Sequence, residues 1–344
     1  MKKELLFVAG LSIVATTIAG AQDLTTPVCP PGNVGQPIPN QARAAQDACQ
    51  QAYDIYQYIA PQLGLALAGG NATLGQGSTL GGLGHFSVGV RANGFQGSLP
   101  DVSNYQPGVQ GAVKNPALAT SDHWVGFPTA DAAIGLFGGF PLALTNVGGV
   151  DALLSAAYVP SYSNGSFSVS PKSSFKMGYG VRVGLLSESI VVPGVSFTYL
   201  KRDLPTTSIA GNFSSGLVGQ GSFKVDNVKV NTTAWRFVAS KSLIMFGIAG
   251  GIGKDQYDQS ADIAATVSTN IVGLPTASAA VPNTSQKMDR TTYFFDASFN
   301  LPLVKIVGEI GQVSGGKVQT YNGFAGGRAD KNLQYFSLGL RFSL

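Results

Sequence analysis

The stretch that decides the fold is the carboxyl-terminal run Phe336-Ser337-Leu338-Gly339-Leu340-Arg341-Phe342-Ser343-Leu344. Large apolar side chains alternate here with small or charged ones up to the last residue, so one face of an extended strand is apolar and the other is polar. This alternation is typical of a strand in a transmembrane β-barrel, where side chains point in turn to lipid and to the lumen. A strand of a soluble β-sandwich is the alternative that this run alone leaves open.

The amino terminus has the pattern of a secretory signal peptide. Two lysines precede an apolar stretch over residues 5–18, which ends in Ala19-Gly20-Ala21, the small-residue motif that a signal peptidase accepts. We therefore predict a signal peptide over residues 1–21, cleavage before Gln22 and export to an oxidising compartment. The alternative is a membrane helix, but the apolar stretch is short and small residues follow it instead of charges.

The composition after the signal peptide argues against helical membrane spans. The chain is 44% hydrophobic and 12% charged and contains 45 Gly, yet no stretch of about twenty apolar residues is free of Gly, Pro or charge. An exported chain with this composition exposes apolar surface elsewhere, and the outer wall of a β-barrel is such a surface. The formal charge is +4, and removal of Lys2, Lys3 and Glu4 leaves +3. Without clustered basic residues, nucleic acid is excluded as a partner.

Two cysteines, Cys29 and Cys49, lie before the predicted barrel. An even number of cysteines in an exported protein favours a disulfide. A bridge between them closes a loop of about twenty residues and stabilises the chain by roughly 3 kcal/mol in the chain-entropy model. Two buried thiols remain the alternative.

Residues 22–83 form an amino-terminal region that differs from the rest of the chain. Residues 22–39 are rich in Pro and small polar residues, and residues 40–60 have apolar residues at helical spacing, with Asn40 as N-cap and Pro61 as the stop. The polar face of this helix carries Gln46, Gln50, Asp54 and Gln57. We expect the helix either to lie in a wet lumen or to cap the periplasmic mouth, followed by a Gly-rich passage over residues 64–84.

The region 84–344 contains repeated segments with a period of two residues. In nearly every clear segment the charged residues fall on the face opposite the large apolar residues. Placing the last strand end in the periplasm makes the short links periplasmic and the long links external, as in bacterial barrels. We therefore predict an all-β, antiparallel transmembrane barrel of 10–12 strands with both chain ends in the periplasm. Fourteen strands are possible if the Gly-rich passage joins the wall. The long links that we expect to be external are 98–128, which could hide a further hairpin, 160–173, 204–222, 255–287 and 315–332.

Catalytic and metal-binding patterns are weak in this chain. Only His85 and His123 could act as general bases near neutral pH, and Asp122 beside His123 does not define a triad. Asp255, Asp258 and Asp262 could collect a calcium ion, but a solvated acidic loop fits their spacing better because the Gly-centred calcium loop is missing. We therefore predict no enzyme activity, no metal site and no cofactor.

Charges on the inward phase of the strands are the one candidate site. They are Arg91, Lys176, Arg182, Arg236, Lys305 and Arg341, against Asp296 and Glu309. Six basic and two acidic groups would favour anions in an open pore. The alternative is a filled barrel, in which these groups pair with each other and with the amino-terminal helix.

Two features of the chain resemble those of known outer-membrane proteins. The strand Tyr335 to Leu344 resembles the signal that the bacterial outer-membrane assembly machinery recognises, with Phe342 third from the end. The order of signal peptide, helical and Gly-rich segment, and barrel resembles that of the outer-membrane long-chain fatty-acid transporter superfamily. That resemblance implies an amino-terminal hatch inside a fourteen-stranded barrel.

These resemblances imply a multi-pass barrel of the bacterial outer membrane, with outer-membrane lipids and the assembly machinery as partners. The leading hypothesis for function is passive transport of small hydrophobic or amphipathic molecules through a plugged barrel. The alternatives are a structural or interaction barrel without a solute path and an anion-leaning porin. The sequence does not decide the oligomeric state.

Overall fold

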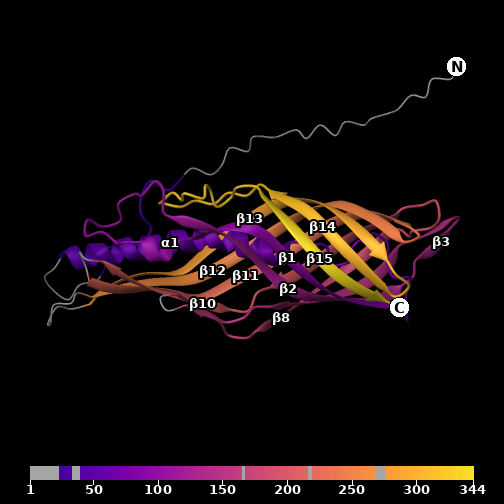
Figure 1. Ribbon diagram of the computed structural model, residues 1–344, viewed down its shortest axis with the longest axis horizontal. Helices are drawn as coiled ribbons and strands as arrows, with labels where there is room; N and C mark the ends of the chain where they lie inside the picture. Colours follow the sequence, from indigo (N-terminus) through magenta and orange to yellow (C-terminus); the bar gives the residue numbers. More distant parts are fainter. Residues whose placement is uncertain (1–22, 33–38, 165–166, 216–218, 269–275) are drawn as a thin grey trace, which may run out of the picture.

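The computed structural model describes residues 23–32, 39–164, 167–215, 219–268 and 276–344, and its main feature is a closed antiparallel β-barrel (Figure 1). Within these ranges ten strands form a ring in the order β12-β13-β14-β15-β1-β2-β5-β8-β9-β11, and pairing of β11 with β12 closes it. The barrel with one amino-terminal helix confirms the predicted fold class. The strands are β1 (Phe86–Pro100), β2 (Thr120–Phe137), β5 (Gly149–Tyr158), β8 (Phe175–Leu186), β9 (Gly194–Asp203), β11 (Gly219–Leu243), β12 (Phe246–Ser268), β13 (Ala277–Asn300), β14 (Val304–Ser314) and β15 (Leu333–Ser343).

The two ends of the barrel differ. At the turn end, short links over residues 138–148, 187–193, 244–245 and 301–303 join the strands, and the first link carries the hairpin β3 (Phe140–Leu142) and β4 (Thr145–Val147). At the opposite loop end, several strands continue far beyond the ring. β10 (Thr207–Ser215) pairs with β11 beyond the end of β9, and β7 (Phe167–Pro171) and β6 (Tyr162–Asn164) follow at its edge.

These extensions correct several predicted loops. Residues 255–287 belong largely to β12 and β13, residues 204–222 contain β10, and the end of 98–128 is the start of β2 instead of a hidden hairpin. The outer face of the extensions is polar and the inner face is apolar, as in a soluble antiparallel sheet. In β12, for example, Lys254 and Asp258 point outward while Tyr257 and Ile263 are buried. The sequence predicts loops here because the segments are long and rich in Gly, Ser, Thr, Asn or Pro.

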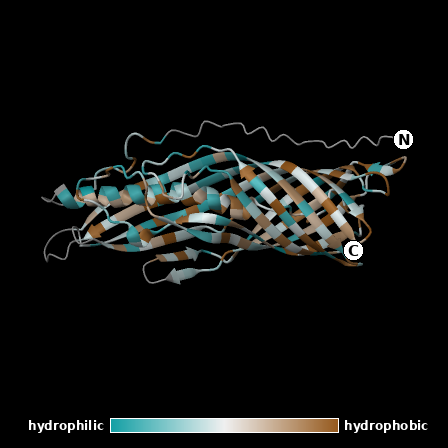
Figure 2. Cartoon of the chain, turned by 45° about the horizontal axis from the view of Figure 1, so that its top comes forward, coloured by the Kyte–Doolittle hydropathy of each residue, from teal (hydrophilic) through white to brown (hydrophobic). Residues whose placement is uncertain are grey.

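The side-chain phase of the carboxyl-terminal strand is the predicted one. Leu338 and Leu340 are exposed on the outer wall, whereas Ser337 and Arg341 are buried inside. Matching outward runs on neighbouring strands form an apolar belt next to the turn end, visible as the brown band in Figure 2. We define this apolar belt by the runs 246–252 on β12, 293–299 on β13, 304–310 on β14 and 336–342 on β15.

The helix α1 (Pro39–Ala68) is longer than predicted, because it continues through Pro61. Its first part packs against the inner face of the extended strands β11 to β13 at the loop end, and its last turns enter the ring (Figure 1). Residues on both sides of the proline, such as Ala60 and Leu65, are buried, so tertiary packing outweighs the helix-breaking effect of the proline. Among the described residues, no helix is both long enough and apolar enough to cross a membrane.

The two described chain ends lie at opposite ends of the barrel. Leu344 pairs with Phe86 at the turn end, where their backbone groups exchange two hydrogen bonds of 3.0 Å. Near the other end of the chain, Leu24 N–H donates to Thr320 O in the link before β15, at the loop end. The prediction that both ends share the periplasmic side is therefore wrong, because the amino-terminal region passes through the barrel. The predicted signal peptide lies outside the described residues.

Candidate functional site

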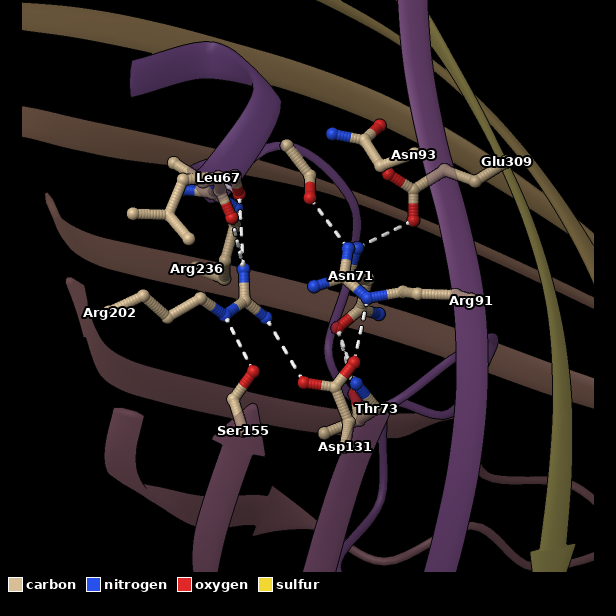
Figure 3. Close-up of polar contacts among 12 residues, drawn as sticks. Leu67, Asn71, Thr73, Arg91, Asn93, Asp131, Ser155, Arg202, Arg236 and Glu309 are labelled. Atoms are coloured by element: carbon tan, nitrogen blue, oxygen red, sulfur yellow. Dashed lines mark hydrogen bonds and ion pairs between the residues drawn. The ribbon is translucent and has the colours of Figure 1, made fainter. Parts of the chain in front are cut away.

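The carboxyl end of α1 lies inside the ring, where arginines from the wall hold its last carbonyls (Figure 3). Arg202 Nη1 donates to Leu67 O at 3.2 Å and to Ala68 O at 3.4 Å, and Arg236 Nη2 also donates to Ala68 O at 3.2 Å. Arg91 Nη1 donates to Gly69 O at 2.6 Å. The last carbonyls of a helix lack intrahelical partners and carry partial negative charge. Three cations therefore stabilise the end of α1 from three different strands.

Carboxylates of the wall accompany these arginines. Arg91 Nε lies 2.7 Å from Asp131, which is also 3.5 Å from Arg202 Nη2, and Arg236 Nη1 lies 2.5 Å from Asp255. All five side chains are nearly or fully buried. A buried charge is costly unless it is paired and hydrogen-bonded. The arginines that hold the helix end are therefore paired by carboxylates of the wall itself.

Beyond α1 the chain continues as an irregular segment over residues 69–85, here called the lumen thread, which leads through the ring to the start of β1 at the turn end. Wall side chains accept hydrogen bonds from its backbone N–H groups. Asn71 N donates to Glu309 at 2.8 Å, Gly75 N to Asp296 at 3.1 Å and Leu80 N to Asp151 at 3.1 Å. A buried segment without helix or sheet needs such partners for its backbone.

Wall arginines serve the carbonyls of the lumen thread. Arg341 Nη1 donates to Thr73 O at 2.9 Å, and Arg182 Nη1 lies 3.4 Å from Gln76 O. Arg182 also pairs with Asp151 at 2.6 Å. Asp151, which accepts a hydrogen bond from Leu80 N of the thread, is therefore held by the same arginine that lies near Gln76 O. Wall carboxylates thus accept hydrogen bonds from N–H groups of the thread, and wall arginines donate hydrogen bonds to its carbonyl groups.

Glycines allow the thread and the wall to approach closely. A Cβ atom on Gly77 would lie 2.7 Å from both Gly194 O and Ser240 N of the wall, and a Cβ atom on Gly339 would lie 2.8 Å from the Leu74 side chain of the thread. Both distances are far shorter than ordinary carbon contacts. Part of the high glycine content therefore serves the packing of the thread inside the barrel.

The structure places the predicted lumen charges as follows. Arg91, Arg182, Arg236, Arg341, Asp296 and Glu309 are buried inside the ring, and Lys305 is partly buried. Lys176 has the inward phase, but its side chain is exposed. Sequence reasoning missed several buried charges because it ended their strands too early or did not apply the strand phase to them; these are Asp131, Asp151, Arg202, Asp255 and Arg290.

The additional residues change the charge balance. The buried charges within the described part of the barrel are now six arginines and five carboxylates, instead of a clear basic excess. Asp255 is a lumen residue on β12, so the prediction of a solvated acidic loop with Asp258 and Asp262 is wrong for this residue. Asp258 points outward to Lys287 at 3.4 Å. In the described ranges no three His, Cys, Asp or Glu side chains are grouped as a metal site would require.

The first half of α1, with the links around it, forms a cap at the loop end. Asp54 accepts hydrogen bonds from Tyr321 N at 2.8 Å and from Asn322 N at 3.0 Å, and Gln50 accepts one from Cys29 N at 3.1 Å. Cys29 and Cys49 are disulfide-bonded, which ties residues 23–32 to the helix. Burial raises the pKa of Asp54 to about 7, although its hydrogen-bond donors act in the opposite direction.

The cap corrects the expected environment of the helix. Its polar face is not in a wet lumen, because Gln50, Asp54 and Gln57 are all buried, and this part of the helix lies at the loop end instead of the end with the short links. The links over residues 101–119 and 315–332 and the amino-terminal residues cover it, and Asp47 accepts a 2.7 Å hydrogen bond from Gly108 N. Amphipathic spacing therefore indicated a helix correctly, but the polar side meets protein instead of water.

Comparisons with known proteins show similarity at the level of the barrel alone. No family and no curated protein matches the sequence. Among solved structures, the autotransporter AIDA-I transport unit of Escherichia coli is 7% identical and covers 86% of this chain and 99% of its own, with a TM-score of 0.33. The translocator domain of the autotransporter NalP of Neisseria meningitidis is 10% identical over 76% and 88%, with a TM-score of 0.32.

A third structure is that of Ail, the attachment invasion locus protein of Yersinia pestis. It is 10% identical and covers 76% of this chain and 99% of its own, with a TM-score of 0.25. Scores this low carry no argument about function, and the resemblance to fatty-acid transporters is not shown. The functional argument therefore rests on the geometry of this chain.

Proposed function

We propose that this chain is a bacterial outer-membrane barrel, closed by its own amino-terminal segment, which displays a disulfide-tied cap on the outer side of the membrane as a structural or interaction module. The observation that carries the proposal is the path of the chain. The cap lies at the loop end, the lumen thread fills the ring, and β1 starts at the turn end.

The outer-membrane location is supported by three features of the chain. The amino terminus has the pattern of a signal peptide, the barrel closes without a free edge in its ring, and exposed apolar side chains, those of the apolar belt among them, lie on its outer wall. Bacterial barrels place short turns in the periplasm and long connections outside. This orientation puts the cap on the cell surface.

Transport is less well supported than a closed barrel. Passive movement of small hydrophobic or amphipathic molecules would require a path past the lumen thread, which is held in the ring by hydrogen bonds to charged wall residues that form buried ion pairs. An anion-leaning pore would require a basic excess, but the buried charges are nearly balanced. Removing the thread would also leave several wall charges without partners.

The path of the chain can be tested on intact cells. An epitope tag placed immediately before Asp23 should bind antibody without permeabilisation, because this residue lies at the loop end, where it pairs with Lys114 at 3.7 Å. The matched control is the same tag inserted between Thr145 and Asn146 in the turn-end hairpin, which should bind only after the outer membrane is opened. The reverse pattern would contradict the proposed orientation.

Planar-bilayer recordings test the closure. The mature chain should show almost no conductance, whereas a variant lacking residues 41–83 should form open channels if it retains the heat-modifiable migration of a folded barrel. An alternative variant with an intact chain, Arg91→Met with Arg202→Met, should show frequent openings because the end of α1 loses two of its cationic partners. Steady conductance by the unmodified chain would refute closure.

A further inference from the structure

The short links at the turn end expose apolar side chains that extend beyond the strands. Ile190 is 95% exposed, Ile244 is 97% exposed, and Phe140 and Leu144 of the β3–β4 link are 67% and 68% exposed. Val191, Leu142, Met245, Leu301 and Leu303 add to the same end. Ordinary protein surfaces seldom expose a contiguous apolar patch of this kind without a partner. We call these residues the apolar turn tips.

The charged groups at the link 187–193 bind backbone atoms. In the four links the only charged residue is Glu188, which accepts a hydrogen bond from Ser242 N. Lys241, at the adjacent strand end, donates to Ser189 O and Ile190 O, the latter at 2.9 Å. These contacts hold the link 187–193 so that Ile190 and Val191 project from it.

The opposite border of the apolar belt looks quite different. Directly beyond the belt, Lys254 on β12 and Asp289 on β13 form an exposed ion pair of 2.8 Å, and Gln312 and Gln334 occupy the outer face of β14 and β15. The belt therefore ends sharply toward the loop end. Toward the turn end, none of the ion pairs in the described part of the chain separates it from the turn tips.

The height of the belt indicates what covers the turn tips. Each defining run contains seven residues. At a rise of about 3.4 Å per residue and a tilt of about 40°, such a run on β12 to β15 spans roughly 18 Å, which is less than the roughly 25 Å of apolar surface typical of outer-membrane barrels. On β8 the outward apolar run over residues 175–185 is longer. Met245, Leu301 and Leu303 lie in the links directly next to the short runs of β12 to β14 and extend them toward the turn end.

We propose that the apolar turn tips insert into the periplasmic leaflet of the membrane, so that lipid, and not water or a protein partner, covers this end of the barrel. The inference rests on the proposed outer-membrane function. Its supporting observation is continuity with the belt: the Phe137 ring at the end of β2 contacts the Phe140 ring of the hairpin, with centroids 5.1 Å apart. Residues 132–150, from β2 through the hairpin to β5, contain no charged side chain.

The test uses the purified mature protein folded into vesicles of phosphatidylcholine and phosphatidylglycerol, with no other protein present. Single spin labels replace Leu144 or Ile190, while the native disulfide is retained. Two control labels replace Leu340 in the belt and Val113 in the loop-end link 101–119, whose exposed fraction of 64% closely matches that of Leu144. Collision with oxygen, which concentrates in lipid, is compared with collision with a water-soluble nickel chelate.

Labels at positions 144 and 190 should collide with oxygen more than with nickel, as the Leu340 label does, and the Val113 label should show the reverse. If positions 144 and 190 behave like Val113, the turn tips lie in water and are free for a periplasmic protein, and the inference is overturned while the barrel remains membrane-embedded. If the Leu340 label also prefers nickel, the proposed membrane function itself fails. Each label is read only in protein with heat-modifiable migration.

Discussion

Single residues of the barrel wall form contacts with the lumen thread inside the ring. Asp151 is a wall carboxylate, but it accepts a hydrogen bond from Leu80 N in the lumen thread and pairs with Arg182, which lies near Gln76 O. Asp151 therefore lies on a strand of the wall but makes contacts with the lumen thread. Its loss should therefore loosen both parts.

Replacing Arg182 by Met should destabilise the folded protein by about 3–5 kcal/mol, because the fully buried Asp151 then keeps its charge without its ion-pair partner. Urea unfolding in detergent micelles measures this loss. The double variant Arg182→Met with Asp151→Asn should recover part of it, and Lys176→Met, at an exposed position of the same strand, should change stability by less than about 0.5 kcal/mol. Equal effects of Arg182→Met and Lys176→Met would contradict the pairing.

At the scale of the element, each long strand has two environments along its outer face. On β15, Leu340 lies within the apolar belt, whereas Gln334 lies beyond its border on the same face. The inner face is packed: Ser337 is 5% exposed, and its hydroxyl lies near Gly70 of the lumen thread. An arginine at Ser337 would therefore clash with the thread, although a wet lumen would have accepted it.

Replacing Leu340 by Arg should cost about 2–4 kcal/mol if the residue lies near the bilayer midplane, because a charge then faces hydrocarbon. Gln334→Arg is the matched control on the same strand and face, and it should cost less than about 1 kcal/mol near the interface. Folding yield into lipid vesicles, read as heat-modifiable migration, compares the two variants. Similar losses for both would show that the membrane border is misplaced.

At the scale of the whole molecule, the cap at the loop end and the barrel are coupled through one continuous chain. Asp54 joins α1 to the link before β15, and the end of the same helix is held by arginines of the wall. Burial raises the pKa of Asp54 to about 7 and that of Asp47 to about 6. Both groups lie outside the apolar belt, so solvent pH reaches them when the cap opens.

The folded cap should therefore be more stable at low pH. Because the folded pKa of Asp54 exceeds the ordinary value of about 3.9, the docked cap binds the proton more tightly than the open one. This contribution, on the order of a few kcal/mol, is complete below about pH 4 and disappears as the pH rises through about 7. Hydrogen exchange of α1 amides at pH 5 and pH 8, corrected for intrinsic rates, measures it.

Asp54→Asn is the control for this pH dependence, because an amide of similar shape cannot titrate. The variant should show nearly the same protection of α1 at pH 5 and pH 8, apart from the smaller effect of Asp47. Protection that rises with pH in the unmodified protein would contradict the assigned direction.

The period-two pattern by itself determined the barrel, the outward and inward phase of its strands, and the short links at the turn end. This was possible because strand side chains alternate strictly and an apolar outer face leaves a clear local signal. Only the tertiary structure decided the strand lengths beyond the belt, the pairing of Arg202 with Asp131, and the path of residues 39–85 through the ring. These features depend on contacts between residues far apart in sequence, and the polar face of α1 reads the same whether water or protein covers it.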